Sequence, residues 1–200
     1  MSIYRTVKPF VLGSGSPRRK DLLGSAGLEF EIKPATCDEP APYPGQDPED
    51  YAIKMAELKA ENVAANNPQA YVLGSDTIVV RDRDILGKPV DRDEAYQMVK
   101  SLCGHKHKVI SGCALISPEG KKISYAVSTE VEFIDFNEAA VRAYAATGEP
   151  DDKAGAYAIQ GQGAFLVKGI SGSYTNVVGL PLARVIETLV DLGVVVAGDC

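Results

Sequence analysis

The stretch V-L-G-S-G-S-P-R-R-K-D-L-L at residues 11–23 decides how the start of this chain folds. Its apolar beginning is typical of the end of a short strand, and the small residues that follow are typical of a turn. Ser16 is a good N-cap for a helix, and Pro17 suits the first helical position, where a missing N–H costs nothing. A strand, a turn and a helix are therefore expected in this order.

The first turn of this expected helix is basic. Arg18, Arg19 and Lys20 place positive charge at the helix end that already carries a positive partial charge. A phosphate would compensate, because backbone N–H groups and two guanidinium groups would converge on it. A basic, solvated helix N-terminus is the alternative, and the stretch alone does not decide between them. Two familiar phosphate motifs are excluded: a Rossmann fingerprint needs glycine at position 18, and no G-K-S or G-K-T triplet completes a P-loop.

The composition is that of an ordinary globular protein. The chain has 200 residues, enough for one domain or two joined lobes around a sizeable core. Its net charge of -6 argues against a broad nucleic-acid-binding face. No apolar run approaches the length of a membrane span and no signal peptide is recognisable, so we expect a cytoplasmic protein. The four cysteines show no C-x-x-C spacing, which favours free thiols: Cys37, Cys103, Cys113 and Cys200.

A proline-rich loop at residues 36–46 contains the acidic pair Asp38 and Glu39. The sequence D-P-E-D that follows it is typical of an N-cap, a proline at the first helical position and an acidic first turn. We expect the resulting helix to end near residue 66. Lys59 lies on it, and its local sequence indicates a solvated surface lysine.

The second informative stretch is Y-V-L-G-S-D-T-I-V-V at residues 71–80, where two β-rich runs flank Asp76. An aspartate is poorly placed in such an apolar run unless a cation, a hydrogen-bond network or a function requires it. A strand-end aspartate that caps a turn is the alternative. Residues 81–84 are expected to form a hairpin tip, and L-G-K-P then places Lys88 at a strand end.

Two histidines, His105 and His107, stand at H-x-H spacing, but no third metal ligand lies nearby in the sequence. One exposed and one strand-facing histidine is the favoured interpretation. The remaining pattern predicts a helix, an antiparallel strand pair and a helix capped by Asn137, at residues 91–102, 109–116 with 123–133, and 137–147.

The glycine-dense stretch E-P-D-D-K-A-G-A-Y-A-I-Q-G-Q-G at residues 149–163 is a candidate binding loop, since glycine lets a backbone approach a ligand closely. Gln160 offers a donor and an acceptor, as an amide that reads a base requires. A glycine-rich connector without function is the alternative. A strand at 165–170, a loop-like segment at 172–178 and a helix from about 179 to 192 are expected to follow.

Five segments in order resemble the Maf family of nucleoside triphosphate pyrophosphatases: G-S-G-S-P-R-R-K-D-L-L, G-S-D-T-I-V, L-G-K-P, D-K-A-G-A-Y-A-I-Q-G and G-S-Y-T-N-V-V-G-L-P. The resemblance covers about residues 11–185. Gly13 stands where the family usually has alanine and Ala158 where it usually has glycine, and neither change removes a functional side chain. The resemblance implies a single domain over residues 1–200 with the α/β fold of inosine triphosphate pyrophosphatases (Maf/Ham1). That fold has a mixed twisted sheet flanked by helices and two lobes around a central cleft.

The resemblance also implies roles for individual residues. Asp76 would be the catalytic proton acceptor that activates water for attack at the α-phosphorus, as in a nucleoside triphosphate diphosphatase. A divalent cation, Mg²⁺ or Mn²⁺, would be held by carboxylates from Asp38, Glu39 and Asp76, and which of the adjacent pair matches the family is open. The residues we assign to substrate binding are Ser14, Ser16, Arg18, Arg19, Lys59, Thr77, Lys88 and Gln160.

The sequence also bears on base preference. In the subgroup of dTTP and UTP pyrophosphatases, the positions of Arg18, Thr77 and Gln160 carry these same residue types, whereas the 7-methyl-GTP subgroup typically has tryptophan at position 18. A methylated, cationic guanine would favour an aromatic face. We therefore expect hydrolysis of dTTP and UTP, and of modified pyrimidine triphosphates. The resemblance implies a homodimer, and we expect it to bind neither nucleic acid nor membrane. The alternatives are a 7-methyl-GTP pyrophosphatase and a nucleotide-sensing regulator of cell division.

Overall fold

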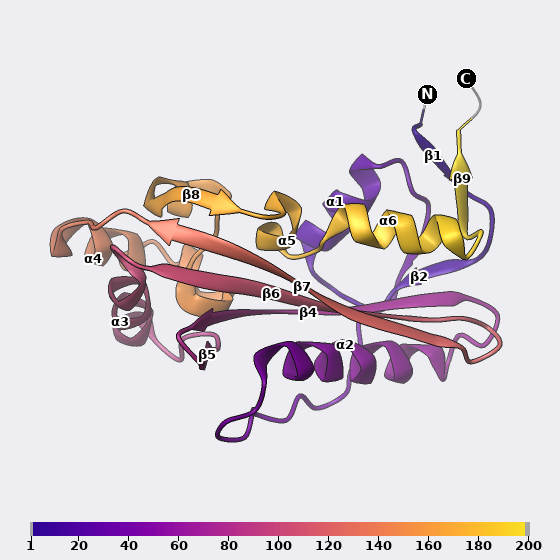
Figure 1. The fold of residues 1–200 in the computed structure, drawn as a ribbon, viewed down its shortest axis with the longest axis horizontal. Helices are drawn as coiled ribbons and strands as arrows, with labels where there is room; N and C mark the ends of the chain where they lie inside the picture. The colour runs from indigo at the N-terminus through magenta and orange to yellow at the C-terminus, as the bar shows by residue number, and fades with distance from the viewer. Residues whose placement is uncertain (1, 199–200) are drawn as a thin grey trace. The chain divides into compact units, whose positions relative to one another are not determined.

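The computed structural model describes residues 2–198 and divides the chain into two compact units. The first unit comprises the chain up to Asp76, Ser111–Val127 and the part from Gly179 onward; the second comprises Thr77–Ile110 and Ser128–Val178. Three of the crossings between them lie within long strands: β4 (Tyr71–Arg81), β6 (Lys106–Ile116) and β7 (Lys122–Phe133) (Figure 1). The single domain expected over residues 1–200 stays a prediction.

The sheet is mixed, which confirms the predicted α/β class. Its strand order is β3-β2-β4-β6-β7-β8, with β5 paired to β4. Strand β2 (Phe10–Leu12) pairs in parallel with β3 (Glu31–Ile32) and β4, whereas β5 (Asp84–Leu86) and β8 (Val167–Ser171) pair antiparallel with β4 and β7. A separate two-stranded sheet joins β1 (Tyr4–Thr6) to β9 (Val195–Ala197).

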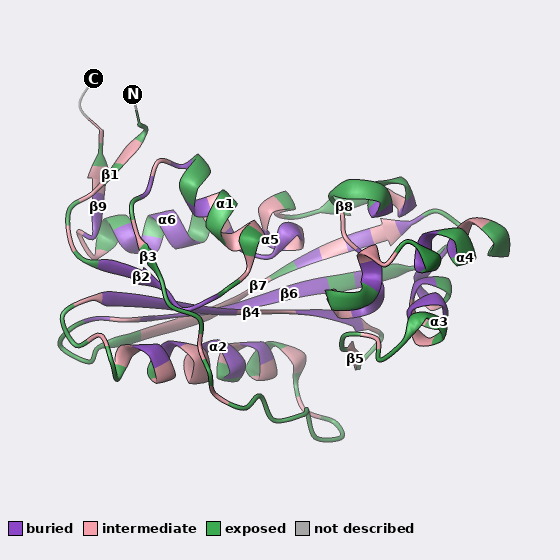
Figure 2. Ribbon diagram, turned by 180° about the vertical axis from the view of Figure 1, so that it is seen from behind, coloured by how far each residue is buried: buried purple, intermediate pink, exposed green. Residues whose placement is uncertain are grey.

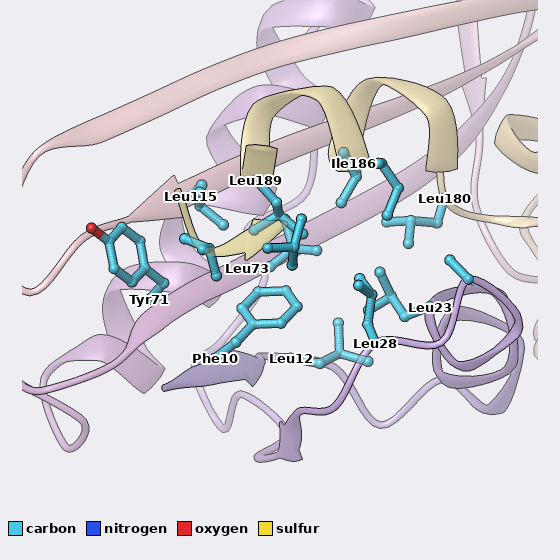
Figure 3. Packing of buried hydrophobic residues seen from close by; sticks show 14 of the residues in the cluster. Phe10, Leu12, Leu23, Leu28, Tyr71, Leu73, Leu115, Leu180, Ile186 and Leu189 are labelled. Atoms are coloured by element: carbon cyan, nitrogen blue, oxygen red, sulfur yellow. The ribbon is translucent and has the colours of Figure 1, made fainter. Parts of the chain in front are cut away.

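In the first unit, helices cover both faces of strands β2 and β4. Helices α1 (Pro17–Ser25) and α6 (Leu182–Asp191) lie on one face and α2 (Pro48–Ala64) on the other (Figures 1 and 2). The main core fills the space between the strands and α1 and α6, where mostly aliphatic side chains from these elements interdigitate (Figure 3). They include Phe10, Leu12, Leu23, Leu28, Tyr71, Leu73, Leu115, Leu180, Ile186 and Leu189.

Helix α2 lies unusually close to the sheet, and two glycines permit it. A Cβ at Gly74 would stand 2.3 Å from the carbonyl oxygen of Ala56, and one at Gly112 would stand 2.1 Å from that of Ala52. Any larger residue at these positions would push the helix away. The close packing brings the side chain of Lys59, on the same helix, next to strand β4.

The second unit has its own core, built on α3 (Arg92–Leu102) and α4 (Glu138–Ala146). Its aromatic centre stacks the ring of His107 edge-on against Phe133 and Tyr157, at centroid distances of 4.8 and 5.3 Å. The rest of the unit includes short helices: η1 (Glu149–Asp152), η2 (Ala154–Ala156), η3 (Gly161–Leu166) and α5 (Tyr174–Val178). His105 is exposed and His107 buried, which confirms their predicted placement.

The longer predicted helices and strands are confirmed, and three short segments differ. Strand β3 covers only two residues of the expected strand at 28–33. The strand expected at 165–170 begins at residue 167, because the preceding residues coil into η3 and bury Leu166. The loop expected at 172–178 contains α5, where the Ser173 hydroxyl accepts from the N–H of Asn176 at 3.2 Å. The buried Asn176 amide in turn donates to the Val109 carbonyl at 3.0 Å.

Within residues 2–198, no helix has the length and apolar character that crossing a bilayer requires. Cys37, Cys103 and Cys113 are free thiols, as predicted. Cys200, the fourth cysteine of that prediction, lies outside the described residues.

Candidate active site

The turn before α1 fixes the side chain of Arg19. The helix begins at Pro17 after the N-cap Ser16, as predicted, but in the described chain the Ser16 side chain forms no capping hydrogen bond. The Ser14 hydroxyl instead accepts from the Ser16 N–H at 3.3 Å and from Arg19 Nη1 at 3.0 Å. Arg19 Nε donates to the Gly179 carbonyl at 2.9 Å. The guanidinium is therefore held by the turn that precedes its own helix and by the segment that leads into α6.

Arg19 also lies within electrostatic reach of Asp76. Burial lowers the pKa of the Arg19 guanidinium and Arg18 lowers it further, while the Asp76 carboxylate opposes both effects. An arginine stays charged even so, and a desolvated cation beside a second cation favours a bound anion. The structure thus brings together the basic turn and the aspartate that the sequence singled out separately.

Lys59 joins two carboxylates. Its Nζ lies 2.7 Å from Asp76 Oδ1 and 2.8 Å from Glu39 Oε2. The side chains of Lys59 and Asp76 are only 13% and 14% exposed, so the interpretation of Lys59 as a solvated surface lysine is wrong. Strand β4 continues past Asp76 to Arg81, so the turn-capping alternative for this aspartate is also wrong. The cation that an aspartate in this apolar run requires is the ammonium of Lys59.

The loop at residues 36–46 reaches this cluster through Glu39, and both Asp38 and Glu39 are exposed. Tyr51 on α2 anchors the same loop, because its hydroxyl donates to the Pro40 carbonyl at 3.1 Å. Burial raises the pKa of Tyr51, and the negative charges of Asp76 and Glu39 raise it further. Sequence reasoning missed Tyr51. A signal was present, since residues eight apart on one helix share a face and Tyr51 stands eight residues before Lys59.

The carboxylates of this site decide what kind of divalent-cation site the residues could form. No group of three or more His, Cys, Asp or Glu side chains in the described part of the chain is arranged to hold a metal ion. Glu39 and Asp76 nevertheless place two carboxylates on one ammonium. Mg²⁺ commonly binds through one or two carboxylates and completes its shell with water and substrate phosphates. The pair therefore fits an ion that arrives with a polyphosphate, and it does not fit an ion held by protein alone.

Three of the residues assigned to substrate binding belong to the second unit. Thr77 follows Asp76 on β4 and is half-buried, while Lys88 is exposed just after β5. Gln160 is exposed at the start of η3, and its side-chain amide forms no hydrogen bond to any residue between 2 and 198. Short helical turns flank it in the glycine-dense stretch, where the sequence showed no clean periodicity.

The first unit thus carries a site in which a half-buried arginine, a shared lysine and two carboxylates lie together at the start of a helix. An α/β protein with such a site is suited to bind a polyphosphate and to hydrolyse it. The chain belongs to the Maf family: the family model described as Maf-like protein matches residues 9–192. This confirms the resemblance seen in the sequence.

Two relatives that match this chain over most of its length share one name. The chain is 45% identical to the dTTP/UTP pyrophosphatase of Nitratidesulfovibrio vulgaris, covering 96% of this chain and 91% of the relative. It is 49% identical to that of Syntrophotalea carbinolica, with coverages of 92% and 85%. Among solved structures, a HAM1 protein from Coxiella burnetii matches with a TM-score of 0.47 at 13% identity, covering 92% of this chain and all of that one. A score this low supports no conclusion about the site.

Proposed function

We propose that this protein hydrolyses dTTP and UTP to the nucleoside monophosphate and pyrophosphate. The observation that carries the proposal is the Lys59 ammonium bridging Asp76 and Glu39, at 2.7 and 2.8 Å, beside Arg19. The shared name of relatives at 45–49% identity supports the substrate class. Modified pyrimidine triphosphates belong to the same proposal, because a change on the base leaves the reacting phosphates unaltered.

In the proposed reaction, Asp76 acts as general base. Its carboxylate takes a proton from a water molecule whose oxygen attacks the α-phosphorus. The bond from that phosphorus to the bridging oxygen breaks, and pyrophosphate leaves with the electron pair. The proton then passes to solvent or to the leaving group, so one water is consumed for each triphosphate. Phosphoryl transfer needs mainly positioning and neutralisation of charge, and the residues of the site can supply both.

Cations of this chain would hold the triphosphate tail. Arg19 presents a guanidinium fixed by Ser14 and Gly179, which suits the paired oxygens of a phosphate. Lys59 can exchange a carboxylate partner for a phosphate oxygen without moving its helix. The residues proposed to complete tail binding are Ser16, Arg18 and Lys88.

Glu39 and Asp76 are the carboxylates proposed to hold Mg²⁺ or Mn²⁺ together with phosphate oxygens, and Asp38, which precedes Glu39 in the loop, belongs to the same proposal. When bound, the ion neutralises charge on the phosphates. Thr77 and Gln160 are proposed to read the base, and Arg18 is the third position whose residue type matches the dTTP and UTP subgroup. An amide carries one donor and one acceptor group, which matches the neutral edge of uracil or thymine.

The test is a pyrophosphate-release screen over nucleoside triphosphates, with Mg²⁺, with Mn²⁺ and without a divalent ion. We expect turnover of dTTP and UTP that depends on the ion. A clear preference for 7-methyl-GTP would reject the substrate assignment. Nucleotide binding without pyrophosphate release under every condition would favour the nucleotide-sensing alternative. The homodimer, the absence of nucleic-acid or membrane binding and the cytoplasmic location stay predictions.

A further inference from the structure

The segment around Gln160 is held by one carboxylate and one phenol. Glu149 Oε2 accepts from the Gln162 N–H at 2.8 Å, and Glu149 Oε1 accepts from the Gly163 N–H at 2.8 Å. The hydroxyl of Tyr144 donates to Glu149 Oε1 at 3.0 Å and accepts from the Ala158 N–H at 3.2 Å. The two side chains therefore fasten the backbone on both sides of Gln160.

The backbone of this segment is shaped to these two groups. Gly161 has a φ of +79°, and a Cβ there would stand 2.4 Å from Glu149 Oε2. A Cβ at Gly163 would stand 2.5 Å from the Tyr144 hydroxyl oxygen. Both glycines thus leave room for the Glu149 carboxylate and the Tyr144 hydroxyl, which we call the clamp. This explains part of the glycine density that the sequence shows at residues 149–163.

Glutamate is the side chain that this arrangement requires. Three donors point at its two oxygens, and a carboxylate is purely an acceptor. Burial alone would raise the pKa of Glu149, but the N–H groups of Gln162 and Gly163 and the Tyr144 hydroxyl outweigh it and lower that pKa. Tyr144 is itself 3% exposed and packs edge-on against Phe165, so its hydroxyl cannot swing away freely.

We propose that Glu149 and Tyr144 are positioning residues for base selection: they hold the backbone on either side of Gln160 so that its side-chain amide faces a pyrimidine edge in a fixed orientation. This inference rests on the proposed function and goes beyond it, because neither residue needs to touch the nucleotide. Weakening the clamp should loosen binding of the base and leave recognition of the triphosphate tail unchanged.

The experiment compares Glu149→Gln with wild type and with Glu132→Gln. Glu132 is a control in the same unit, whose carboxylate accepts from Lys168 at 2.7 Å on β8. We expect Glu149→Gln to raise the KM for dTTP and UTP about tenfold, as the loss of hydrogen bonds to a charged group suggests. The kcat should stay within about twofold on the same reasoning. Inhibition by inorganic triphosphate, a probe without a base, should be unchanged. The control variant should match wild type throughout.

A second pair of variants separates positioning from general damage. Tyr144→Phe keeps the ring and loses the hydroxyl, and should raise the same KM about threefold. In a Gln160→Ala background, Glu149→Gln should have little further effect on KM, since the group that it positions is gone. If Glu149→Gln fails to fold, Tyr144→Phe, measured alone and in the Gln160→Ala background, decides the matter.

The outcomes distinguish this inference from the proposed function. Wild-type protein that releases no pyrophosphate from dTTP or UTP would overturn both. An active wild type whose KM for dTTP is unchanged in Glu149→Gln and Tyr144→Phe would overturn the inference alone. So would an equal weakening of dTTP and inorganic triphosphate, or full additivity with Gln160→Ala.

Discussion

Asp76 in the first unit and Glu149 in the second are both half-buried carboxylates, yet their partners differ in kind. Asp76 is paired with the ammonium of Lys59, which it shares with Glu39. Glu149 accepts from two backbone N–H groups and a tyrosine hydroxyl. A side-chain cation can exchange partners when an anion arrives, whereas backbone N–H groups keep the chain in one shape. This difference matches the roles proposed above, in which Asp76 takes part in the reaction and Glu149 holds the backbone in position.

The two regions are also held in place differently. Lys59 meets Asp76 because Gly74 and Gly112 let α2 lie against the sheet. The segment around Gln160 is held by hydrogen bonds from its backbone to the side chains of Tyr144 and Glu149. Changes to packing should therefore act on the first region, and changes to single acceptors on the second.

Asp76→Asn should have the largest effect. Removing the proposed general base while keeping the shape of the side chain should lower pyrophosphate release from dTTP by about 1,000-fold. Nucleotide binding should persist, because the cations that grip the tail are retained. Steady-state kinetics and calorimetric binding check the two parts. Asp93→Asn, at an exposed aspartate in the first turn of α3, is the control. Unchanged turnover in Asp76→Asn would remove the distinction between the two carboxylates.

His107 is buried in the core of the second unit, and this burial makes the folding stability depend on pH. Burial, with a smaller effect of Arg81, lowers the pKa of His107 to about 4 from an unperturbed 6.5. The unfolded chain therefore binds more protons between pH 6.5 and 4, so folding stability falls as the pH drops through this range. The loss attributable to His107 is about 3 kcal/mol. Urea unfolding at several pH values should show it in wild type and not in His107→Gln. Parallel curves for both proteins would contradict the expectation.

Lys59→Met tests the exchangeable cation of the first region. Without the ammonium, Asp76 and Glu39 lose the cation that they share and the triphosphate loses one partner, so kcat/KM for dTTP should fall about 50-fold. Lys54→Met changes an exposed lysine on the same helix and should leave kcat/KM near the wild-type value. Equal losses of kcat/KM in both variants would show that the positive charge of the helix as a whole matters, and would contradict a specific role for Lys59.

Gly74→Ala should have the smallest effect of the four. The added methyl would meet the Ala56 carbonyl, the Ala60 N–H and the Ala60 side chain, and the resulting shift of α2 should lower the free energy of unfolding by about 2 kcal/mol. Gly169→Ala is the matched control, because no described atom lies within 4 Å of a Cβ there. Chemical denaturation measures both variants. Equal stability of the two would mean that close packing does not bring Lys59 to Asp76.

Much of this arrangement could be predicted from the sequence. The turn-helix signal at Ser16 and Pro17 gave the correct start of α1, and the misfit of Asp76 in an apolar run indicated a cation, a hydrogen-bond network or a function. Local sequence could not identify Lys59 as that cation. In its local sequence Lys59 resembles a surface lysine. Its ion pair with Asp76 depends on the close packing of α2 against the sheet, which Gly74 and Gly112 permit from outside that helix.

The clamp around Gln160 could not be predicted from local sequence either. Tyr144 and Glu149 belong to a helix end and a 3₁₀ turn, and their common target appears only when residues 158–163 fold back onto them. Helix α5 was missed for a related reason, since tertiary hydrogen bonds of Asn176 stabilise a turn whose sequence is loop-like.

The most direct test of the central claim follows the oxygen of the attacking water. Hydrolysis of dTTP or UTP by wild-type protein in ¹⁸O-labelled water should place the label in the nucleoside monophosphate and none in pyrophosphate. That result would confirm attack at the α-phosphorus, the step proposed for the water activated by Asp76. Label in the pyrophosphate, or release of orthophosphate in its place, would contradict the account.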